Sequence, residues 1–439
     1  MNSPSFLPTS ARWIFLLGVS MAFLTACQPE PAQVDDPKAL TSDADNGTLN
    51  LPDGFGAIVV ADTIGRARHI AVRDNGDIYV KLRKLQNGHG ILALRDTDGD
   101  GRIDQTDGFG EFTGTGIAIH DGYLYATSDS SVYRYELVEG QLLPKLPGQL
   151  MVGGFPIQGQ HAAKPLTFDG MDNMYVNIGA PSNACQEEMR TKGSPGLDPC
   201  PQLDRQAGIW RFSASQPGQT QIADGHRYAT GIRNAMALDW NAEVNSLFVV
   251  QHGRDDLDRL FPEHFTTEER LELPAEEFLQ VSDGDDFGWP YCYFDGFTDK
   301  KTLAPEYGGD GEKQGRCEGM KAPIESFPAH LAPNDLLFYN GDMFPEKYKK
   351  GAFIAFHGSW NRAPAEQQGY FVVFVPLLNG IPSGEWEVFA SGFPNLEEVK
   401  SPRDAVYRPT GLAQGPDGSL YITDSVKGRI WRVVYDGHV

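Results

Sequence analysis

The fold is decided by a stretch near the C-terminus, Asp417-Gly418-Ser419-Leu420-Tyr421-Ile422, which leads to Gly428-Arg429-Ile430-Trp431-Arg432-Val433. A polar turn opens the first run, and polar and apolar side chains then alternate. The second run contains aromatic and basic residues. Turn residues followed by short alternating runs rich in β-branched and aromatic side chains are typical of antiparallel strand pairs. The stretch therefore predicts one β-hairpin.

Five further copies of this hairpin precede it. Their first strands follow turns at Asn75, Asp121, Asp172, Asn245 and Lys350, and we expect the second strand of the fourth copy at 258–260. Helical periodicity is almost absent, and a single helix is expected within 262–278. Six self-similar hairpins predict an all-β fold, a six-bladed β-propeller with inserted loops at the active-site end. An immunoglobulin-like sandwich fits six copies of one hairpin less well.

The N-terminus has the pattern of an export signal. Arg12 precedes an apolar run over 13–24, which is short for a membrane span and ends near Leu24-Thr25-Ala26-Cys27. Small residues before a cysteine resemble a bacterial lipobox, although an ordinary signal with a chance cysteine is the alternative. We therefore expect a signal peptide over 1–27 with lipidation at Cys27, a flexible acidic linker over 28–50, and the propeller over 51–439. The mature protein would be a lipoprotein on the periplasmic face of a bacterial membrane.

Four cysteines follow Cys27, and an even number in an exported chain favours disulfides. Three pairings are open. We expect Cys185–Cys200 and Cys292–Cys317, because each pair closes a local loop rich in glycine and proline. The formal net charge of −22 argues against nucleic acid as a partner, because nucleic-acid-binding proteins carry basic faces.

An acidic turn follows the second strand of the first repeat. Asp96, Asp98 and Asp100 occupy positions 1, 3 and 5 of a loop that has Gly101 at position 6. This is the spacing of an EF-hand calcium loop, although position 12 is Asp107 where glutamate is usual, and no flanking helices are expected. The turn predicts a structural calcium site, with an ordinary acidic surface turn as the alternative. The expected ligands are Asp96, Asp98, Asp100, the backbone of Arg102, Asp104 and Asp107.

Polar motifs recur just before or after the predicted strands. They are Gly159-Gln160-His161, Gly231-Ile232-Arg233-Asn234, Gln251-His252-Gly253-Arg254-Asp255-Asp256, Phe287-Gly288-Trp289-Pro290, His357-Gly358-Ser359-Trp360-Asn361-Arg362 and Arg408-Pro409-Thr410-Gly411-Leu412. In a propeller such positions gather at one mouth of the channel. Arginine binds carboxylates in a bidentate manner, tryptophan stacks on planar groups, and histidine accepts protons. The set suits a planar, anionic ligand.

These motifs resemble the soluble quinoprotein sugar dehydrogenases, which use pyrroloquinoline quinone (PQQ). The resemblance covers about residue 51 to the C-terminus, and the stretch His357–Arg362 is most similar to the sorbosone and pyranose dehydrogenase branch. It implies oxidation of a sugar or a related alcohol or aldehyde by hydride transfer to the quinone. The electron acceptor would be a periplasmic cytochrome or quinone, and the only membrane contact would be the lipid anchor.

The resemblance also implies roles for individual residues. His161 would be the general base, and Arg233 would stabilise negative charge on the quinone. The backbone carbonyls of Gly253 and Arg254 would hold a calcium ion beside the cofactor. The expected cofactor-binding side chains are Asn234, Trp360, Asn361, Arg362 and Arg408. After the base, the sequence departs from the glucose-oxidising branch at Ala162-Ala163-Lys164-Pro165-Leu166, on the substrate side.

Two other functions remain open at the level of sequence. A calcium-dependent propeller lactonase or other hydrolase would need carboxylate or amide ligands in the channel, and Asn234, Asp255 and Asp256 could supply them. A non-enzymatic propeller would use the same arginine and histidine residues as a binding face.

Overall fold

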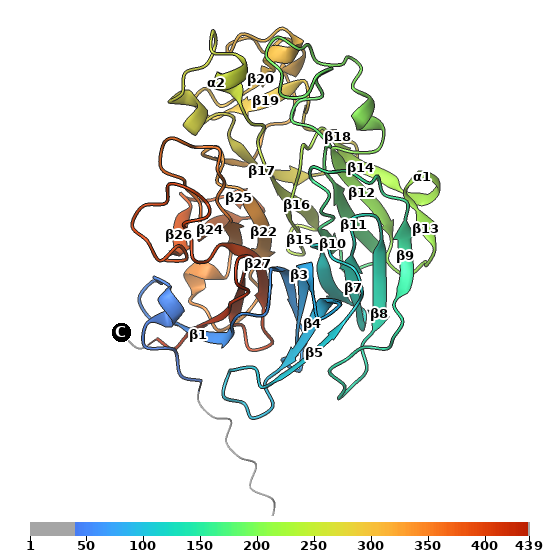
Figure 1. Ribbon diagram of the computed structural model, residues 1–439, viewed down its shortest axis with the longest axis vertical. Helices are drawn as coiled ribbons and strands as arrows, with labels where there is room; N and C mark the ends of the chain where they lie inside the picture. Colours follow the sequence, from blue (N-terminus) through green and yellow to red (C-terminus); the bar gives the residue numbers. More distant parts are fainter. Residues whose placement is uncertain (1–39, 438–439) are drawn as a thin grey trace, which may run out of the picture. The chain divides into compact units, whose positions relative to one another are not determined.

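The computed structural model describes residues 40–437, which form a six-bladed β-propeller (Figure 1). The prediction of an all-β, six-bladed fold is confirmed. Each blade has four antiparallel strands, and short strands pair in parallel with the edges of the second and third blades. The six innermost strands contact one another in a ring around the central axis. The predicted signal peptide over 1–27, the lipobox Cys27 and the first part of the predicted linker lie outside the described residues.

The first blade contains β2 (Ala67–Val72), β3 (Ile78–Gln86), β4 (His89–Arg95) and β5 (Gln105–Phe109). The second contains β6 (Ile117–His120), β7 (Tyr123–Thr127), β8 (Val132–Glu136) and β9 (Gln149–Gly153), with β13 (Gln219–Thr220). The third contains β10 (Leu166–Phe168), β11 (Asn173–Ile178), β12 (Gly208–Ser213) and β14 (His226–Thr230), with β18 (Asp285–Asp286). The fourth blade contains β15 (Ala237–Asn241), β16 (Ser246–Gln251), β17 (Glu276–Val281) and β21 (Glu325–Phe327). The fifth contains β22 (Pro333–Phe338), β23 (Gly351–Phe356), β24 (Phe371–Leu378) and β26 (Glu387–Ala390), with β25 (Ile381–Pro382). The sixth contains β27 (Pro409–Gln414), β28 (Leu420–Asp424), β29 (Ile430–Tyr435) and β1 (Phe55–Ala61).

The sixth blade joins the two ends of the described chain. β1 pairs with β29, so an N-terminal strand completes a blade whose other strands are C-terminal (Figure 1). Residues just before β1 also fold onto this blade: a 3-10 turn (Asn46–Thr48) places the Gly47 carbonyl 2.9 Å from Trp431 Nε1, and Leu49 is buried. The predicted linker over 28–50 is therefore wrong at its C-terminal end, because these residues pack on the propeller.

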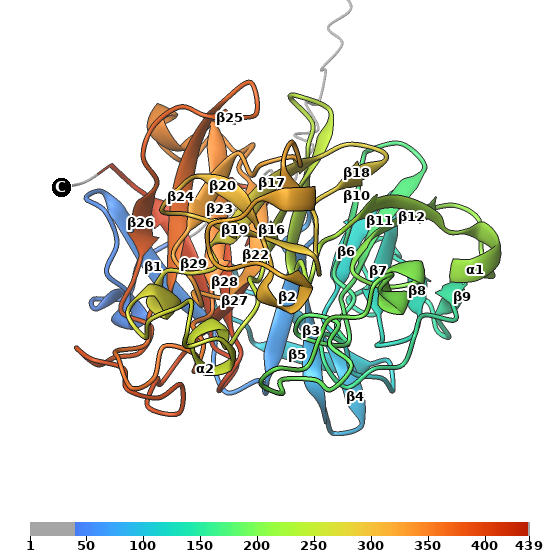
Figure 2. The same ribbon diagram turned by 90° about the horizontal axis from the view of Figure 1, so that it is seen from above.

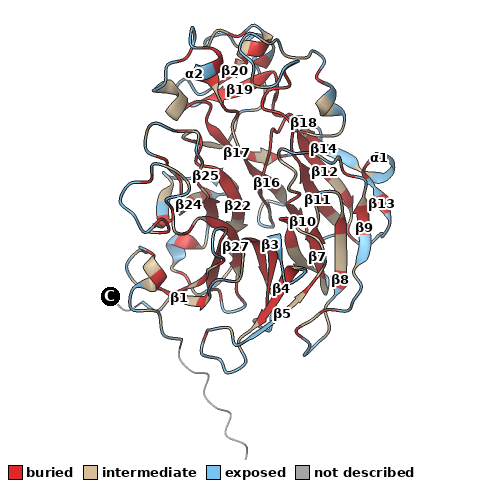
Figure 3. Ribbon diagram, in the orientation of Figure 1, coloured by how far each residue is buried: buried red, intermediate tan, exposed pale blue. Residues whose placement is uncertain are grey.

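The hydrophobic core lies between neighbouring blades, and the blade strands are mostly buried (Figure 3). Side chains of successive strand residues point to opposite faces. In β28, Leu420 packs with Phe353 and Phe374 of the fifth blade, whereas Tyr421 packs with Ile78 of the first blade. The alternation that marks each hairpin in the sequence therefore serves two blade interfaces at once.

The turns before the second strands explain why three of the six repeats begin with Asp-Gly or Asn-Gly. In the second blade, Asp121 and Gly122 have φ values of 45° and 76°, and Gly418 in the sixth blade has a φ of 87°. These left-handed conformations suit glycine and aspartate, and two of them in succession match the right-handed twist of the strands that they join.

The fourth blade differs from its prediction. Residues 258–260 belong to the short helix α2 (Leu257–Leu260), and the second strand of that hairpin is β17. The helix expected within 262–278 is also wrong, because that region contains only a 3-10 turn (Glu269–Leu271) and the start of β17. Leu247, Val249 and Phe278 fill the blade interfaces from this sheet, so strand burial outweighs the helix-start signal.

The inserted loops lie outside the ring of blades. A hairpin of β19 (Cys292–Asp295) and β20 (Lys300–Leu303) stands beyond the fourth blade together with α2 (Figures 1 and 2). The disulfides Cys185–Cys200 and Cys292–Cys317 are both formed, as predicted, and their four cysteines share one small core. The remaining short helices are α1 (Gln221–Asp224) and 3-10 turns at Pro201–Asp204, Pro305–Tyr307, Gly315–Cys317 and Glu346–Tyr348. No helix within residues 40–437 has the length and hydropathy that crossing a bilayer requires.

Candidate active site

A pocket of about 750 Å³ lies where the six innermost strands begin. Every blade contributes residues from just before its first strand or at its start, and five blades add residues from the end of the second strand. Antiparallel pairing brings these two positions to the same edge of a sheet. The contributing residues include Arg66 and Arg68, Thr113 and Thr115, His161, Asn234, Asn334 and Arg408 at the first position, and Arg83, Asp129, His252, His357 and Ser425 at the second.

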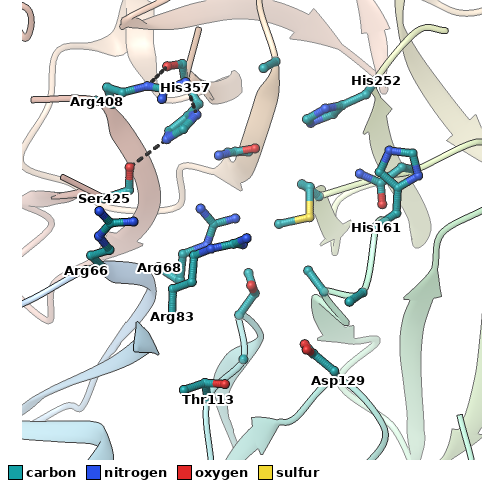
Figure 4. Close-up of a pocket in the computed structure, with 18 of the residues that line it drawn as sticks. Arg66, Arg68, Arg83, Thr113, Asp129, His161, His252, His357, Arg408 and Ser425 are labelled. Atoms are coloured by element: carbon teal, nitrogen blue, oxygen red, sulfur yellow. Dashed lines mark hydrogen bonds between the residues drawn. The ribbon is translucent and has the colours of Figure 1, made fainter. Parts of the chain in front are cut away.

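One side of the pocket is cationic. Arg66, Arg68 and Arg83 come from the first blade, and Arg408 comes from the sixth (Figure 4). Arg403 adds a fifth guanidinium. Asp129 is the single carboxylate among the lining residues. Arg68 is buried, and its Nε has no hydrogen-bond partner. Burial, together with the neighbouring charges of Arg83 and Arg408, lowers its pKa to about 10, so it remains charged at neutral pH.

His161 stands on the opposite side of the pocket (Figure 4). Its Nδ1 lies 2.6 Å from the Ala180 carbonyl, which can only accept, so Nδ1 carries the hydrogen and Nε2 carries a free lone pair. Burial of the ring and the nearby Arg233 lower its pKa to about 3. His161 is therefore a neutral base at physiological pH, with its hydrogen fixed on the nitrogen that faces the protein.

The loop that carries His161 is held in a left-handed conformation. His161 has a φ of 49°, which costs energy for a residue with a Cβ. Gln158 Nε2 lies within 3.0 Å of the carbonyls of Gln160, His161 and Gly179, and this contact fixes the loop against the third blade. The surrounding contacts thus impose the orientation of the imidazole.

Two further histidines line the pocket. His252 Nε2 donates to the Pro333 carbonyl at 2.7 Å, and burial lowers its pKa to about 4. Arg408 donates to His357 Nδ1 at 2.9 Å, so Nε2 of that ring donates to Ser425 Oγ at 2.7 Å. Arg408 also donates to the carbonyls of His357 and Gly358, which positions its guanidinium.

Arg233 lies behind the pocket wall in a buried ionic network. Its guanidinium donates to the Gly253 carbonyl at 2.8 Å, to Asn183 Oδ1 at 3.1 Å and to Asp255 Oδ2 at 3.0 Å. Asp255 also accepts from Arg190 at 2.7 Å and from Asn361 at 2.6 Å. The arginine charges hold the pKa of Asp255 well below its usual range even though burial opposes them. Asp255 is the anion that pairs with Arg233, and Asp256 gives Arg190 a second carboxylate partner.

The Gly253 and Arg254 carbonyls offer a limited set of ligands for calcium. The Gly253 oxygen already accepts from Arg233, and the Arg254 side chain forms a buried ion pair with Glu306. Calcium takes six to eight oxygen ligands. Two neutral carbonyls fit such an ion only if the cofactor and water supply the remaining oxygens.

Trp360, Asn361 and Arg362, the predicted cofactor-binding residues of the loop after β23, do not line the pocket. Trp360 is 61% exposed, and Asn361 donates to Asp255. Arg362 is buried, with its guanidinium bonded to the carbonyls of Leu271 and Ala329. Direct cofactor contact by Arg362 is a prediction that this geometry does not support, because its donors are committed to backbone carbonyls. His161, Asn234 and Arg408 do line the pocket, as expected.

The residues present fit a planar polycarboxylate such as pyrroloquinoline quinone. The orphaned Nε of buried Arg68 calls for an acceptor, and four more guanidinium groups face the same space. An unpaired buried donor costs about 1–3 kcal/mol, and carboxylates are the natural partners of arginine. The donor set is therefore suited to a ligand with several carboxylates.

The acidic turn lies between β4 and β5, apart from the pocket lining. Oxygens of Asp96, Asp98 and Asp104 lie within 4.8 Å of one another, so these three could hold a metal ion. Asp100 and Asp107 are outside this group: Asp100 accepts from the Arg102 amide, and Asp107 lies within β5 and accepts from Gln105. Three of the expected ligands are brought together.

The sequence analysis assigned Arg408 on the cationic side of the pocket but missed the other four arginines there. Arg66 and Arg68 precede or begin the first strand of the first blade, the same position that His161 and Arg233 occupy in later blades. This shared position in the repeat could have predicted that Arg66 and Arg68 lie in the pocket. Arg83 lies within the second strand of the first blade, and Asp129 follows the second strand of the second blade, so only the pairing of the strands brings them to the mouth.

Comparison with known proteins gives the family. A family model described as TrAA12-like matches residues 49–436. An uncharacterised protein from Borreliella burgdorferi is 27% identical over 423 residues, covering 89% of this chain and 91% of that protein. The pyrroloquinoline quinone-dependent pyranose dehydrogenase of Coprinopsis cinerea is 28% identical over 194 residues, which cover 36% of this chain and 24% of that enzyme.

Solved structures share the fold at lower identity. The holo form of the PQQ domain of the Coprinopsis cinerea pyranose dehydrogenase superposes with a TM-score of 0.69 at 18% identity, covering 88% of this chain and 97% of that one. A calcium structure of a Trichoderma reesei AA12 enzyme gives a TM-score of 0.71 at 18% identity over 92% of this chain and 100% of that one. The resemblance seen in the sequence motifs is confirmed, and the chain belongs to the TrAA12-like family of PQQ-dependent, sugar-dehydrogenase-like oxidoreductases.

Proposed function

We propose that this protein oxidises a hydroxyl-bearing carbon of a sugar or related alcohol, with pyrroloquinoline quinone in the arginine-lined pocket and His161 as the general base. The observation that carries this proposal is the state of His161: a neutral imidazole with its free Nε2 lone pair in the pocket, opposite several arginines. A base with a pKa below the working pH is unprotonated and ready to accept.

The quinone supplies, when bound, the acceptor for a hydride, that is, for two electrons and one proton. His161 Nε2 takes the hydroxyl proton as the C–H bond breaks, and the substrate carbon becomes a carbonyl carbon. The Nδ1–H bond to the Ala180 carbonyl keeps Nε2 aimed at the substrate and stabilises the imidazolium that forms. Arg68, Arg408 and Asn234 would bind the polar edge of the cofactor.

Arg233 and the calcium site are the finer parts of the proposal. Arg233 would stabilise negative charge that develops on the quinone, and to do so its guanidinium would exchange the Gly253 carbonyl for the cofactor. The carbonyl released in this way would then be free, with that of Arg254, to bind calcium as a Lewis acid. Trp360 and Asn361 would act at the rim of the site.

The protein is proposed to work outside the cytoplasm. Its two disulfides are typical of oxidising compartments. A lipid anchor at Cys27 would hold it at the periplasmic face of a bacterial membrane, where a cytochrome or a quinone could take the electrons.

The hydrolase alternative is less well supported. Within residues 40–437, the one group of three or more ligating carboxylate, histidine or cysteine side chains that could hold a metal ion is the acidic turn, and none of its members lines the pocket. A channel metal with carboxylate ligands therefore lacks its donors.

The test is reconstitution of the full chain purified without cofactor. Pyrroloquinoline quinone and calcium should restore reduction of an artificial dye with at least one member of a sugar panel, and chelation should remove that activity. Absence of both quinone binding and dye reduction would overturn the proposal. Hydrolysis of a sugar lactone without quinone would favour the hydrolase instead.

A further inference from the structure

Two arginines of the first blade face each other across a strand pair without a counter-ion. The Arg83 amide donates to the Arg66 carbonyl at 2.9 Å, which makes the two residues direct neighbours on β3 and the chain entering β2. Both side chains are exposed, both line the pocket, and no hydrogen bond or ion pair of either side chain is found among the described residues. Like charges directly opposite each other on a strand pair are destabilising.

This arrangement contrasts with the arginines elsewhere on the surface. Arg102, Arg316, Arg429 and Arg432 each form an ion pair with an aspartate. The chain carries 59 acidic residues against 37 basic ones, so carboxylate partners are abundant. An acidic protein that leaves two neighbouring arginines unpaired at the mouth of a pocket keeps a local site of opposite charge, which attracts anions.

We propose that Arg66 and Arg83 bind a carboxylate group of the substrate, so that the preferred substrate is an acidic sugar of the uronic acid class. This inference rests on the proposed oxidation and adds the substrate class to it. Guanidinium groups match carboxylates in geometry as well as charge.

The depth of the arginines separates a cofactor role from a substrate role. Arg68 is buried with an orphaned Nε, and Arg408 is held by the His357 loop, so these two suit a resident cofactor. Arg66 and Arg83 are exposed at the mouth, where an incoming sugar arrives first. A ligand that is exchanged at each turnover is better served by exposed groups.

The opposite wall gives the acidic sugar an orientation. Asp129 lines the pocket on the side away from Arg66, and His161 lies on the same side as Asp129 (Figure 4). Asp129 repels a substrate carboxylate, whereas Arg66 and Arg83 attract it. The carboxylate end of the sugar then points towards the first blade and leaves the other end near His161.

The test uses Arg66→Gln, Arg83→Gln and the double variant of the full chain. Lys84→Gln is the matched control, because it removes an exposed positive charge from the same strand, and the next residue of a strand points to the opposite face. The first measurement is kcat/KM for glucuronate and for glucose in protein loaded with quinone. The second is calorimetric titration of each sugar, and of the quinone, into each variant.

We expect the wild type to favour glucuronate and each single variant to lower the ratio of acid to neutral kcat/KM by roughly tenfold to a hundredfold, as expected for loss of a hydrogen bond to a charged group. Lys84→Gln should keep the wild-type ratio. Arg83→Gln should also raise the thermal midpoint slightly, because it removes a like-charge contact, whereas an arginine with a structural role would lower it.

Three results would overturn the inference. The first is a wild type that binds glucose as tightly as glucuronate, and the second is a double variant that keeps the preference for the acidic sugar. The third is a loss of quinone affinity in the double variant, which would assign these arginines to the cofactor. Failure of the proposed function looks different, because no sugar then supports dye reduction. The sugar titrations still decide the inference in that case, since they measure glucuronate binding without turnover.

Discussion

The pocket and the acidic turn both have the charge to attract ions, and they are built in opposite ways. The pocket is cationic and takes residues from all six blades, from Arg66 to Val426. The turn is anionic and takes Asp96, Asp98 and Asp104 from nine consecutive residues. A site assembled from distant segments depends on the whole fold, whereas a site within one turn depends on local backbone geometry.

The two regions also differ in how their charges are held. Behind the pocket, Arg233 and Asp255 are buried, and Arg233 depends on Asp255 for neutralisation. In the turn, Asp96 accepts from the Gly99 and Gly101 amides, and Asp104 accepts from Thr97. Breaking a buried pair leaves an uncompensated charge, whereas an exposed carboxylate can turn to water. We therefore expect large effects from the pocket and smaller ones from the turn.

The largest expected effect is on turnover. His161→Ala should lower kcat by about 10²–10⁴-fold, which is the usual contribution of a general base. Quinone affinity should survive, because the arginines remain. Dye reduction under saturating sugar and calorimetric titration of the quinone measure the two properties separately.

His252→Ala serves as the comparison for His161→Ala. His252 also lines the pocket, but its Nε2 hydrogen is bonded to the Pro333 carbonyl and it stands on the fourth blade. If both variants lose kcat equally, the base is not His161. The same holds if His161→Ala loses quinone affinity but turns over normally once the quinone is saturating.

The second expected effect is on stability. Asp255→Asn removes the counter-charge of the buried Arg233 and weakens the contacts of Arg190 and Asn361. Loss of one partner from a buried ion pair costs about 3–5 kcal/mol in the free energy of unfolding. Urea unfolding of the full chain with its disulfides intact measures this change.

A surface pair provides the control for Asp255→Asn. Asp198 and Arg316 are both about half exposed, and Asp198→Asn should cost less than about 1 kcal/mol. Equal costs for the two substitutions would mean that the network behind the pocket is no more coupled than an ordinary surface pair.

The difference between the regions also explains what could be predicted from sequence. The hairpin repeat showed the fold because each copy carries its own turn and alternation, as at Asp121-Gly122. The acidic turn was visible for the same reason. The sequence pattern failed where the local structure depends on packing. A strand was predicted at residues 258–260, but they form a helix, because α2 and the loops around it pack on the β19–β20 insert.

The pocket was predictable only where motifs carried a family resemblance. His161, Asn234 and Arg408 were assigned in this way and do line it. Arg68 and Arg83 were missed, since only the position of Arg68 in its repeat, and nothing in the sequence around Arg83, distinguishes them from solubilising surface charges. Their role depends on which strand ends meet at the channel mouth, and on a burial that leaves Arg68 Nε without a partner. Contacts across blades are properties of the assembled ring.

The smallest expected effect concerns calcium at the turn. If Asp96, Asp98 and Asp104 bind the ion, calcium at a hundredfold excess over its Kd should stabilise the wild type by about 2.7 kcal/mol, and Asp96→Asn should lose most of that gain. Asp100→Asn should keep it, because Asp100 lies outside the group. Thermal midpoints with calcium and with a chelator, taken without quinone, separate this ion from one beside the cofactor. An equal response of both variants would mean that the turn binds no specific ion and that, of the two regions, only the cationic pocket binds ions. A loss confined to Asp96→Asn would show that nine consecutive residues suffice for a cation site, whereas the pocket requires the closed ring of blades.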